Sequence, residues 1–370
     1  MKIAIVHDQL REFGGAERVL VALKQIYPQA DVFTSTFDLN SLGEHKELIK
    51  HWNVHVSWFG KIPLINRLYS PLRFLTPLIW ESFDFSKYDL VISSTGSWMC
   101  KGINTKKLTL HISYIHHPPR YLYGYETAVE WQKHSIIKIY GVFINHFLRL
   151  WDYESSQKPD HLIANSVETQ RRITKFYRRD STVIYPPVNI PETINYKLPT
   201  LNYFITVSRL ARAKHVDLLI RAANKYKFQL KIVGVGRDMQ YLQSIAGKTV
   251  EFLGNVSDKK LKDLYQNAKA FLFASIDEEF GIAPVEAMGY GLPVIAFSSG
   301  GLKETMHDDI NGYLFQEQTE KSVGDAIEKL QSLSSEKYVE MRKSSRNESE
   351  KYSEAVFKSK ITQLVNSLTR

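Results

Sequence analysis

The stretch from residue 278 to residue 286 reads Glu278-Glu279-Phe280-Gly281-Ile282-Ala283-Pro284-Val285-Glu286. It follows an apolar run, Ala270–Ala274, that is typical of a buried strand. Gly281 favours a tight turn, and Pro284 suits the first turn of a helix, where its missing N–H costs nothing. We expect Glu286 in that same first turn, beside free backbone donors. Together these features predict a pocket for a phosphorylated, hydroxyl-rich ligand; the alternative is an ordinary strand–loop–helix with solvated acids.

The pattern continues beyond this stretch. A glycine-rich break at 289–293 leads to a second apolar run, Val294–Phe297. Ser298-Ser299-Gly300-Gly301 follows, and a helical pattern then begins. This succession, with glutamates at positions 278 and 286, resembles the donor-sugar half of retaining glycosyltransferases with the GT-B fold, in particular glycosyltransferase family 4.

Short apolar runs alternate with helical patterns, which predicts parallel sheets covered by helices. The expected strands are Lys2–Val6, Asp31–Thr36, Asp89–Ser93, Leu110–Ile115, His161–Ala164, Thr182–Tyr185, Tyr203–Val207, Gln229–Val233, Val250–Leu253, Ala270–Phe273 and Pro293–Ala296. Pro186-Pro187 and the polar stretch to Pro199 read as a link between two lobes. The resemblance implies an α/β GT-B fold, with two Rossmann-like domains facing across a cleft. These are an acceptor-binding domain at 1–190 and a nucleotide-sugar-binding domain at 191–352.

The C-terminal segment, 353–370, has the pattern of an amphipathic helix. Its apolar residues are Val356, Phe357, Ile361, Leu364, Val365 and Leu368. The resemblance implies that this helix crosses back to the N-terminal domain. The sequence alone equally allows a contact between two copies of the chain.

Composition limits the setting and the partners. A chain of 370 residues with 44% hydrophobic and 24% charged residues is globular and favours two domains. The single cysteine, Cys100, rules out an intramolecular disulfide and fits a reducing cytoplasm. The first apolar run is too short for a signal peptide, and no apolar stretch is long enough to span a bilayer. The net charge of +9 requires an anionic partner, for which nucleotide sugars, anionic membrane surfaces and nucleic acid all qualify.

Two cations, Arg209 and Lys214, come just after the strand expected at Tyr203–Val207. Cations at the end of a parallel strand fit a diphosphate, and an arginine can bind two of its oxygens at once. The family resemblance gives both residues the role of neutralising the leaving nucleoside diphosphate.

Glycines mark three further loops. Gly14-Gly15 precedes a helical pattern, and such a pair lets a backbone approach a diphosphate, although a plain strand-to-helix turn is the stronger interpretation on its own. The family resemblance places this loop opposite the donor diphosphate. Gly234-Val235-Gly236 lacks the third glycine of a dinucleotide fingerprint, so we interpret it as a structural turn. The resemblance also assigns donor contacts to Gly254, Asn255, Phe280, Gly281 and Ile282.

The segment Tyr114-Ile115-His116-His117-Pro118-Pro119-Arg120-Tyr121 narrows the resemblance. Neighbours on a strand point to opposite sides, so His116 and His117 cannot both enter one pocket if the strand continues. The family places a histidine close to the transferred sugar, and His116 matches it by its spacing from Arg120. This segment looks like the mannosyltransferase branch of O-antigen and exopolysaccharide assembly. Glu279 departs from the family pattern, in which a glycine is usual, and leaves the exact hexose open.

The resemblance therefore implies transfer of a hexose, with GDP-mannose favoured as donor, to a lipid-linked or oligosaccharide acceptor. In the family pattern Glu286 binds the ribose and Glu278 holds the hydroxyls of the sugar. The chain has no Asp-x-Asp triplet, and Arg209 and Lys214 can carry the leaving charge, so we expect no metal and no cofactor. The alternatives are a UDP-sugar donor, a sugar-nucleotide 2-epimerase, and a non-catalytic basic module that binds membrane or nucleic acid.

Two segments suit a lipid interface. Residues 58–80 interleave apolar and aromatic side chains with Lys61, Arg67 and Arg73, and residues 136–151 carry Lys138, His146 and Arg149 among apolar neighbours. Both segments could equally be core-facing helices. A peripheral position on the inner face of the plasma membrane is one reading of these patterns.

Overall fold

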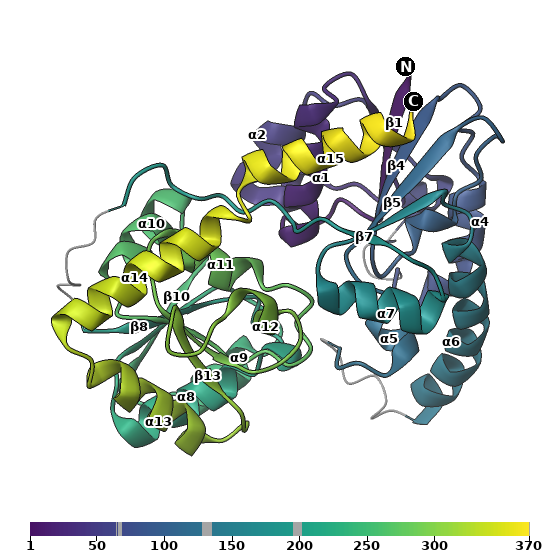
Figure 1. The fold of residues 1–370 in the computed structure, drawn as a ribbon. Coiled ribbons are helices and arrows are strands. Elements are labelled where there is room, and N and C mark those ends of the chain that lie inside the picture. The colour runs from purple at the N-terminus through teal and green to yellow at the C-terminus, as the bar shows by residue number, and fades with distance from the viewer. Residues whose placement is uncertain (64, 66–68, 128–134, 195–201, 370) are drawn as a thin grey trace. The chain divides into compact units, whose positions relative to one another are not determined.

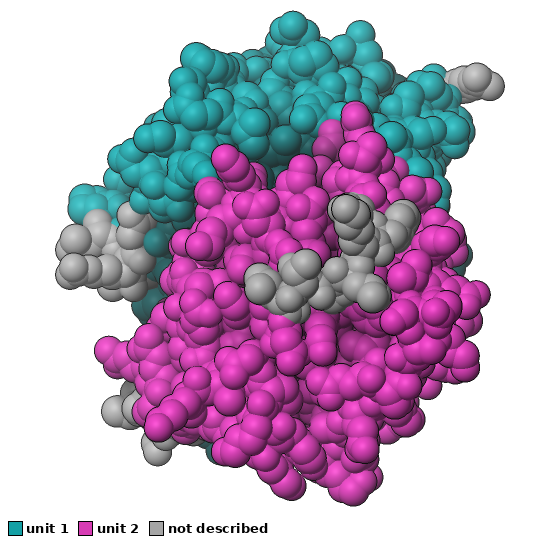
Figure 2. All heavy atoms as spheres, turned by 90° about the vertical axis from the view of Figure 1, so that its left-hand side faces the viewer, with its two compact units in different colours: residues 1–125, 130–187, 355–370 teal, residues 126–129, 188–354 magenta. Residues whose placement is uncertain are grey.

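The structure is a computed structural model that describes residues 1–63, 65, 69–127, 135–194 and 202–369. The chain forms two compact units, coloured separately in Figure 2. Unit 1 comprises residues 1–125, 130–187 and 355–370, and unit 2 comprises residues 126–129 and 188–354. Arg67 and residues 195–199 of the expected link lie outside the described residues.

Unit 1 is built on a parallel sheet with the strand order β3-β2-β1-β4-β5-β6-β7 (Figure 1). The strands are β1 (Ile3–His7), β2 (Asp31–Thr34), β3 (Val54–Val56), β4 (Leu90–Thr95), β5 (Leu110–Ile115), β6 (His161–Ala164) and β7 (Thr182–Val183). The α-helices are α1 (Gly15–Ile26), α2 (Lys46–Ile49), α4 (Thr76–Glu81), α5 (Arg120–Tyr123), α6 (Ser135–Ser156), α7 (Val167–Tyr177) and α15 (Glu354–Leu368). Short 3-10 helices are η1 (Leu39–His45), η2 (Trp58–Lys61), η3 (Pro71–Leu75) and η4 (Cys100–Gly102).

Alternate residues of the central strands fill different cores, as expected of a sheet covered on both faces. In β1, Ile5 packs in a cluster with helix α1, whereas Ala4 and Val6 pack in another cluster with Trp80 and Trp151. The segment 58–80 belongs largely to this second core, since Phe59, Ile65, Ile79 and Trp80 are all buried there.

The C-terminal helix α15 completes the first of these cores. Phe357, Ile361 and Val365 are spaced four residues apart, are at most 3% exposed, and join the cluster of Ile5. The ring of Phe357 meets that of Tyr114 in β5, with centroids 5.9 Å apart. The expectation that the helix returns to the N-terminal domain is therefore confirmed.

Unit 2 repeats the architecture with the strand order β10-β9-β8-β11-β12-β13 (Figure 1). Its strands are β8 (Phe204–Val207), β9 (Leu230–Val233), β10 (Val250–Gly254), β11 (Phe271–Phe273), β12 (Val294–Phe297) and β13 (Gly312–Phe315). Its helices are η6 (Arg212–Lys214), α8 (Val216–Tyr226), α9 (Met239–Ile245), α10 (Asp258–Asn267), α11 (Ile282–Gly289), α12 (Leu302–Thr305), α13 (Glu320–Gln331) and α14 (Ser335–Glu350). All recorded pairings in the two sheets are parallel, which confirms the α/β prediction.

Strands β3 and β13 are absent from the sequence-based expectation, and each lies at the edge of its sheet. Among the described residues, none of the helices is both long enough and apolar enough to cross a bilayer.

Candidate active site

Three neighbouring strands of unit 2 carry most of the predicted donor-binding residues. Strands β8, β11 and β12 lie side by side and run parallel, so their carboxyl ends share one edge of the sheet. The loops that leave them contain Arg209 and Lys214, then Glu278, and then the segment Ser298–Gly301. Ligands of open parallel sheets bind outside this edge, which makes the three loops a candidate site.

The ammonium group of Lys214 and the carboxylate of Glu278 form an ion pair, with Nζ 2.6 Å from Oε2. The Ser275 hydroxyl lies 2.8 Å from the same carboxylate oxygen, and 3.0 Å from the carbonyl of Ala213 next to Lys214. The side chains of Lys214 and Glu278 are 25% and 15% exposed, so both are accessible to a ligand. Two predicted residues that are 64 positions apart are thus in direct contact.

The loop that carries Arg209 is supported by the glycine turn after β9. A Cβ atom on Gly234 would lie 2.0 Å from the carbonyl oxygen of Ser208, and one on Gly236 would lie 2.1 Å from that of Leu210. The Leu210 N–H also donates to the carbonyl of Val235 at 3.0 Å. Glycine is required at both positions because the two backbones touch, which supports the interpretation of this segment as a structural turn.

The Glu278 loop is supported in the same way by the loop after β12. A Cβ on Gly300 would lie 2.1 Å from the carbonyl oxygen of Glu278, and one on Gly301 would lie 2.1 Å from that of Glu279. The Gly301 N–H donates to the Glu278 carbonyl at 2.8 Å. The glycine pair that follows β12 therefore fixes the backbone on which Glu278 stands.

The second glutamate occupies a different helical position from the expected one. Helix α11 begins at Ile282, directly after Gly281, which has a φ of +88°. Glu286 is therefore the fifth helical residue and lies in the second turn, so the prediction of a first-turn Glu286 is wrong. The left-handed conformation of Gly281 lets the helix start two residues before Pro284, and this early start moves Glu286 along the helix.

The remaining predicted donor residues of unit 2 lie around this edge. Phe280 is 2% exposed and its ring packs on Tyr352, with centroids 5.2 Å apart, so only its backbone can face a ligand. Gly254 ends β10, and its carbonyl accepts the Gly234 N–H at 2.8 Å. This bond ties Gly254 to the glycine turn beneath Arg209, and Asn255 next to it is exposed.

In unit 1 the predicted residues Gly14 and His116 are joined by a buried chain of polar groups. The Gly14 N–H donates to one carboxylate oxygen of Glu17 at 2.8 Å. The other oxygen of Glu17 lies 3.3 Å from Nε2 of His7, whose Nδ1 is 3.1 Å from Oγ of Ser94. The same hydroxyl lies 2.8 Å from Nε2 of His116. This chain of polar groups starts at the N-terminus of α1, which begins at Gly15, and ends at the candidate histidine, His116, directly after β5.

The chemistry of Glu17 sets the direction of this chain. A carboxylate can only accept, so Nε2 of His7 donates to Glu17; when this is the only proton on the ring, Nδ1 accepts the Ser94 hydroxyl. The oxygen of Ser94 then accepts from Nε2–H of His116. In this arrangement the imidazole of His116 keeps a proton on Nε2, directed at Ser94, so Glu17 influences the tautomer of His116 through His7 and Ser94.

Sequence reasoning missed His7, Glu17 and Ser94, whose side chains are at most 8% exposed. The signal that could have found His7 and Ser94 is the run of polar residues at the carboxyl ends of the neighbouring strands β1 and β4, whereas Glu17 lies in the first turn of α1. Asp8 belongs to the same run and holds the loop after β4. Its carboxylate accepts the backbone N–H groups of Gly96, Trp98 and Cys100 at 2.8, 2.8 and 2.9 Å.

His117 is not part of this chain. Strand β5 ends at Ile115, and Nδ1 of His117 lies 3.0 Å from the carbonyl oxygen of Pro118. The ring of His117 is half-buried beside Gly96, where a Cβ would come within 3.2 Å of its Nε2. The choice of His116 over His117 remains a prediction; of these two histidines, His116 is the one linked to Glu17 through Ser94 and His7.

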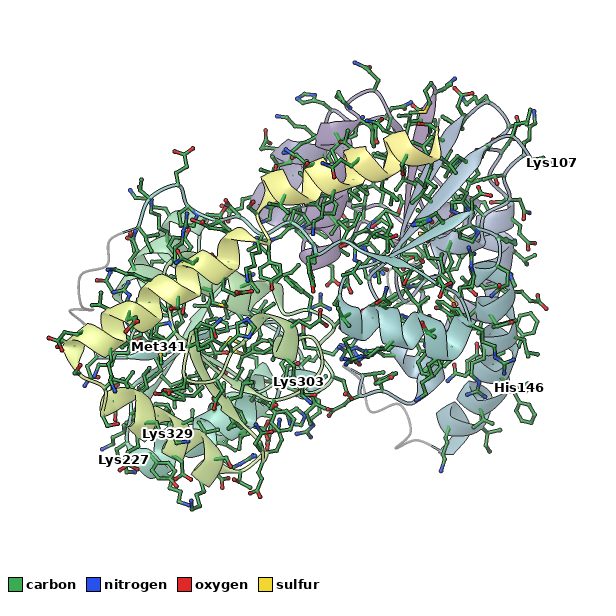
Figure 3. The ribbon with its side chains drawn as sticks, in the orientation of Figure 1. Lys107, His146, Lys227, Lys303, Lys329 and Met341 are labelled. Atoms are coloured by element: carbon green, nitrogen blue, oxygen red, sulfur yellow. The ribbon has the colours of Figure 1, made fainter. Side chains whose placement is uncertain are left out.

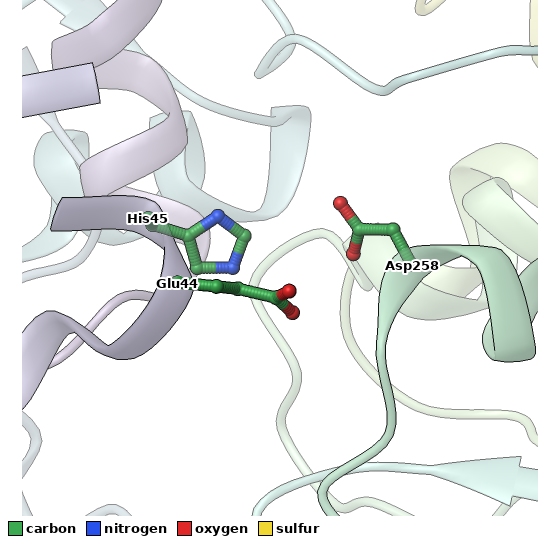
Figure 4. Close-up of side chains that lie close together, drawn as sticks. All are labelled: Glu44, His45 and Asp258. Atoms are coloured by element: carbon green, nitrogen blue, oxygen red, sulfur yellow. The ribbon is translucent and has the colours of Figure 1, made fainter. Parts of the chain in front are cut away.

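Glu44, His45 and Asp258 are drawn together in Figure 4. Glu44 and His45 belong to η1 in unit 1, whereas Asp258 begins α10 in unit 2. The three side chains thus do not form a site within either unit. The expectation of a metal-independent reaction stays a prediction.

Comparison with known proteins identifies both units. Residues 13–191 match the model of Glycosyltransferase Family 4, and residues 194–348 match that of Glycosyl transferases group 1. The O-antigen chain mannosyltransferase RfbU of Salmonella typhimurium is 27% identical over 301 residues, which cover 76% of this chain and 80% of the relative. An alpha-1,3/1,6-mannosyltransferase of Candida glabrata is 26% identical over 377 residues, covering 83% of this chain and 78% of the relative.

A relative that matches over a shorter segment and two solved structures agree with these family matches. An uncharacterized glycosyltransferase of Methanocaldococcus jannaschii is 37% identical over 115 residues, but the chain spans only 30% of its length. Sucrose-phosphate synthase from Thermosynechococcus elongatus has a TM-score of 0.75 at 18% identity, with 100% of this chain and 99% of that chain covered. HepE of Anabaena in complex with UDP-glucose has a TM-score of 0.70 at 19% identity, with 99% and 100% covered. These structures show a shared fold.

Proposed function

The chain belongs to the glycosyltransferases of family 4, with the GT-B fold, and on that basis we propose that it moves a hexose from GDP-mannose to a lipid-linked or oligosaccharide hydroxyl. The mannosyltransferases among its relatives support the choice of mannose. The UDP-glucose complex of HepE keeps a UDP-sugar donor as the alternative. Assembly of a cell-surface polysaccharide is the proposed setting, because the Salmonella relative acts on the O-antigen chain.

The observation that carries this proposal is the ion pair between Lys214 and Glu278. A sugar diphosphate has an anionic diphosphate and a hydroxyl-rich sugar. The diphosphate can bind the ammonium group of Lys214, and the sugar hydroxyls can donate to the carboxylate of Glu278. We propose that Arg209 and Lys214 bind the diphosphate and that Glu278 accepts hydrogen bonds from the sugar hydroxyls. Glu286 is proposed to bind the ribose.

We propose that His116 acts at the transferred sugar and that Gly14 and Gly15 contact the diphosphate. The family resemblance implies that the configuration of the sugar is retained. The acceptor hydroxyl would attack the sugar on the same face that the diphosphate leaves, guided by that diphosphate. Two cations and the backbone N–H groups at the start of α11 are proposed to carry the leaving charge without a metal or cofactor.

Nucleotide binding tests the proposal directly. GDP should raise the melting temperature more than UDP or ADP, because a ligand at a hundredfold excess over its Kd stabilises the folded state by about 2.7 kcal/mol. GDP-mannose should yield free GDP and a mannosylated acceptor, at a rate that EDTA leaves unchanged. A stronger shift with UDP would select the UDP-sugar alternative, and an epimerised sugar nucleotide as product would reject transfer.

Glu17→Gln should lower kcat by roughly 10- to 100-fold with little change in KM, since a hydrogen bond to a charged group contributes about 1.5–3 kcal/mol. A glutamine amide can donate to His7, which reverses the chain and moves the proton of His116 to its other nitrogen. The nitrogen-15 chemical shifts of the histidine ring should report this change of tautomer. Glu47→Gln, at an exposed glutamate of α2, serves as the matched control. A normal kcat with an altered tautomer would remove His116 from the mechanism.

The proposed compartment is the cytoplasm, at the inner face of the plasma membrane. A lipid-linked acceptor is held there, and the net charge of +9 favours an anionic surface.

A further inference from the structure

Helix α6 lies at the edge of unit 1 (Figure 1), and one of its faces carries a stripe of exposed apolar side chains. The stripe repeats at intervals of three and four residues, which is the spacing of one helix face. Its members, with their exposed fractions, are Ile139 (61%), Val142 (55%), Phe143 (72%), Phe147 (52%), Leu150 (56%) and Tyr153 (40%). We name this set the α6 stripe. Apolar helix faces normally turn toward a core, so this orientation requires a partner.

The opposite face of α6 is already committed to unit 1. Leu148 and Trp151 pack in a core cluster, and the carboxylate of Asp152 is buried against Lys101 and the hydroxyl of Tyr123. Asn145 donates to the carbonyl of Tyr121 at 3.3 Å. Because these contacts fix the rotation of the helix, the α6 stripe cannot turn inward.

Between Lys138 and Tyr153 the exposed ionic charges of α6, on Lys138 and Arg149, are positive. Lys138, His146 and Arg149 are exposed on the same helix, and His146 projects outward in Figure 3. Asp152, the only acidic residue between positions 138 and 153, is buried, and the first exposed acid on the helix is Glu154. An apolar surface bordered by cations matches the headgroups and acyl boundary of anionic lipid.

The same charges disfavour a second copy of the chain as the partner. Only one exposed acid, Glu154 at the C-terminal end of the stripe, could pair with Lys138 or Arg149 of another copy, whereas an anionic lipid surface offers negative charge along the whole stripe. The length of the stripe also suits a membrane surface. From Ile139 to Tyr153 it extends about 21 Å along the helix at 1.5 Å per residue, and an interfacial helix buries such a face to a depth of about 5–10 Å.

We propose that the α6 stripe docks unit 1 on an anionic phospholipid surface, lying in the plane of that surface. Docking of the α6 stripe rests on the proposed function in its choice of surface, because a lipid-linked acceptor would be held in such a membrane. The proposal favours α6 over the segment 58–80, where Phe59, Ile79 and Trp80 are buried and the guanidinium of Arg73 lies 4.2 Å from the ring centroid of Tyr121.

Co-sedimentation with vesicles tests the proposal. The wild-type chain should bind phosphatidylcholine vesicles that contain phosphatidylglycerol, should bind pure phosphatidylcholine more weakly, and should be released by salt. Phe143→Ser with Phe147→Ser should weaken binding at least about tenfold, because both rings lose a buried apolar surface. Lys138→Glu alone should weaken binding only to the anionic vesicles. A matched control replaces Leu108, 96% exposed in unit 1, and Ile310, 57% exposed in unit 2, by serine.

The outcomes separate membrane docking from donor binding. The Phe143/Phe147 variant should keep the wild-type melting temperature shift with GDP, since both side chains are exposed and neither is among the proposed donor-binding residues. Wild-type vesicle binding in that variant would overturn the role of α6. No binding of the wild-type chain to anionic vesicles, or a dimer in solution that the variant abolishes, would overturn the membrane proposal while leaving the proposed transferase activity intact.

Discussion

Replacing Arg209 and Lys214 together by alanine should lower turnover by about a thousandfold or more and should abolish the stabilisation by nucleoside diphosphate. Removal of one preorganised group that stabilises developing charge costs about 10²- to 10³-fold in kcat, and this variant removes two. The measurement is steady-state transfer together with calorimetry of GDP binding. Folding should persist because Arg209 is exposed and Lys214 is partly exposed.

The matched control removes two lysines of unit 2 that lie elsewhere. Lys329 in α13, labelled in Figure 3, and Lys337 in α14 are both exposed, and their double alanine variant changes the net charge by the same amount. If the control lost as much turnover as the Arg209/Lys214 variant, the effect would be one of overall charge. Wild-type turnover in the Arg209/Lys214 variant would remove these residues from the donor site.

Glu278→Gln should separate the two halves of the donor. Transfer should fall by about 100-fold or more, because the sugar hydroxyls lose their charged acceptor. Free GDP should bind at least as tightly as to the wild type, since Lys214 no longer has a carboxylate 2.6 Å from its ammonium group. Calorimetry with GDP and with GDP-mannose measures the two effects separately.

Glu286→Gln provides the comparison. If Glu286 holds the ribose, this variant should lose affinity for GDP and for GDP-mannose alike, whereas Glu278→Gln loses affinity only for the sugar-bearing ligand. Both substitutions preserve side-chain volume, so a difference between them reports on chemistry. Equal losses of GDP affinity in both variants would contradict the assigned roles.

Central strands could be predicted from the sequence more accurately than edge strands. Leu110–Ile115 and His161–Ala164 form strands with the expected bounds, because buried parallel strands are nearly continuous apolar runs. The three residues of β3 are too few for this signal, and β13 begins at Gly312, a residue type that favours a turn over a strand. The position of Glu286 was missed because helix onset depends on the φ of Gly281, which the sequence alone does not specify.

The contacts of the candidate site also differ in how far the sequence could predict them. The contact between Lys214 and Glu278 could be expected from a family pattern, whereas the link from Glu17 to His116 requires the strand order β1-β4-β5. The pattern of α6 shows an apolar face but does not say where that face points. Only the burial of Leu148 and Trp151 on the other side decides this.

The return of α15 has a consequence for synthesis on the ribosome. Phe357, Ile361 and Val365 are synthesised after the whole of unit 2, yet they fill the core around Ile5 in strand β1. Domains made first usually fold first. Here the N-terminal part of unit 1 lacks the helix that covers its core while residues 188–354 are being synthesised, so the apolar residues around Ile5 stay exposed during that time. Nascent chains of this protein are therefore open to chaperone binding at this core until helix α15 has been made.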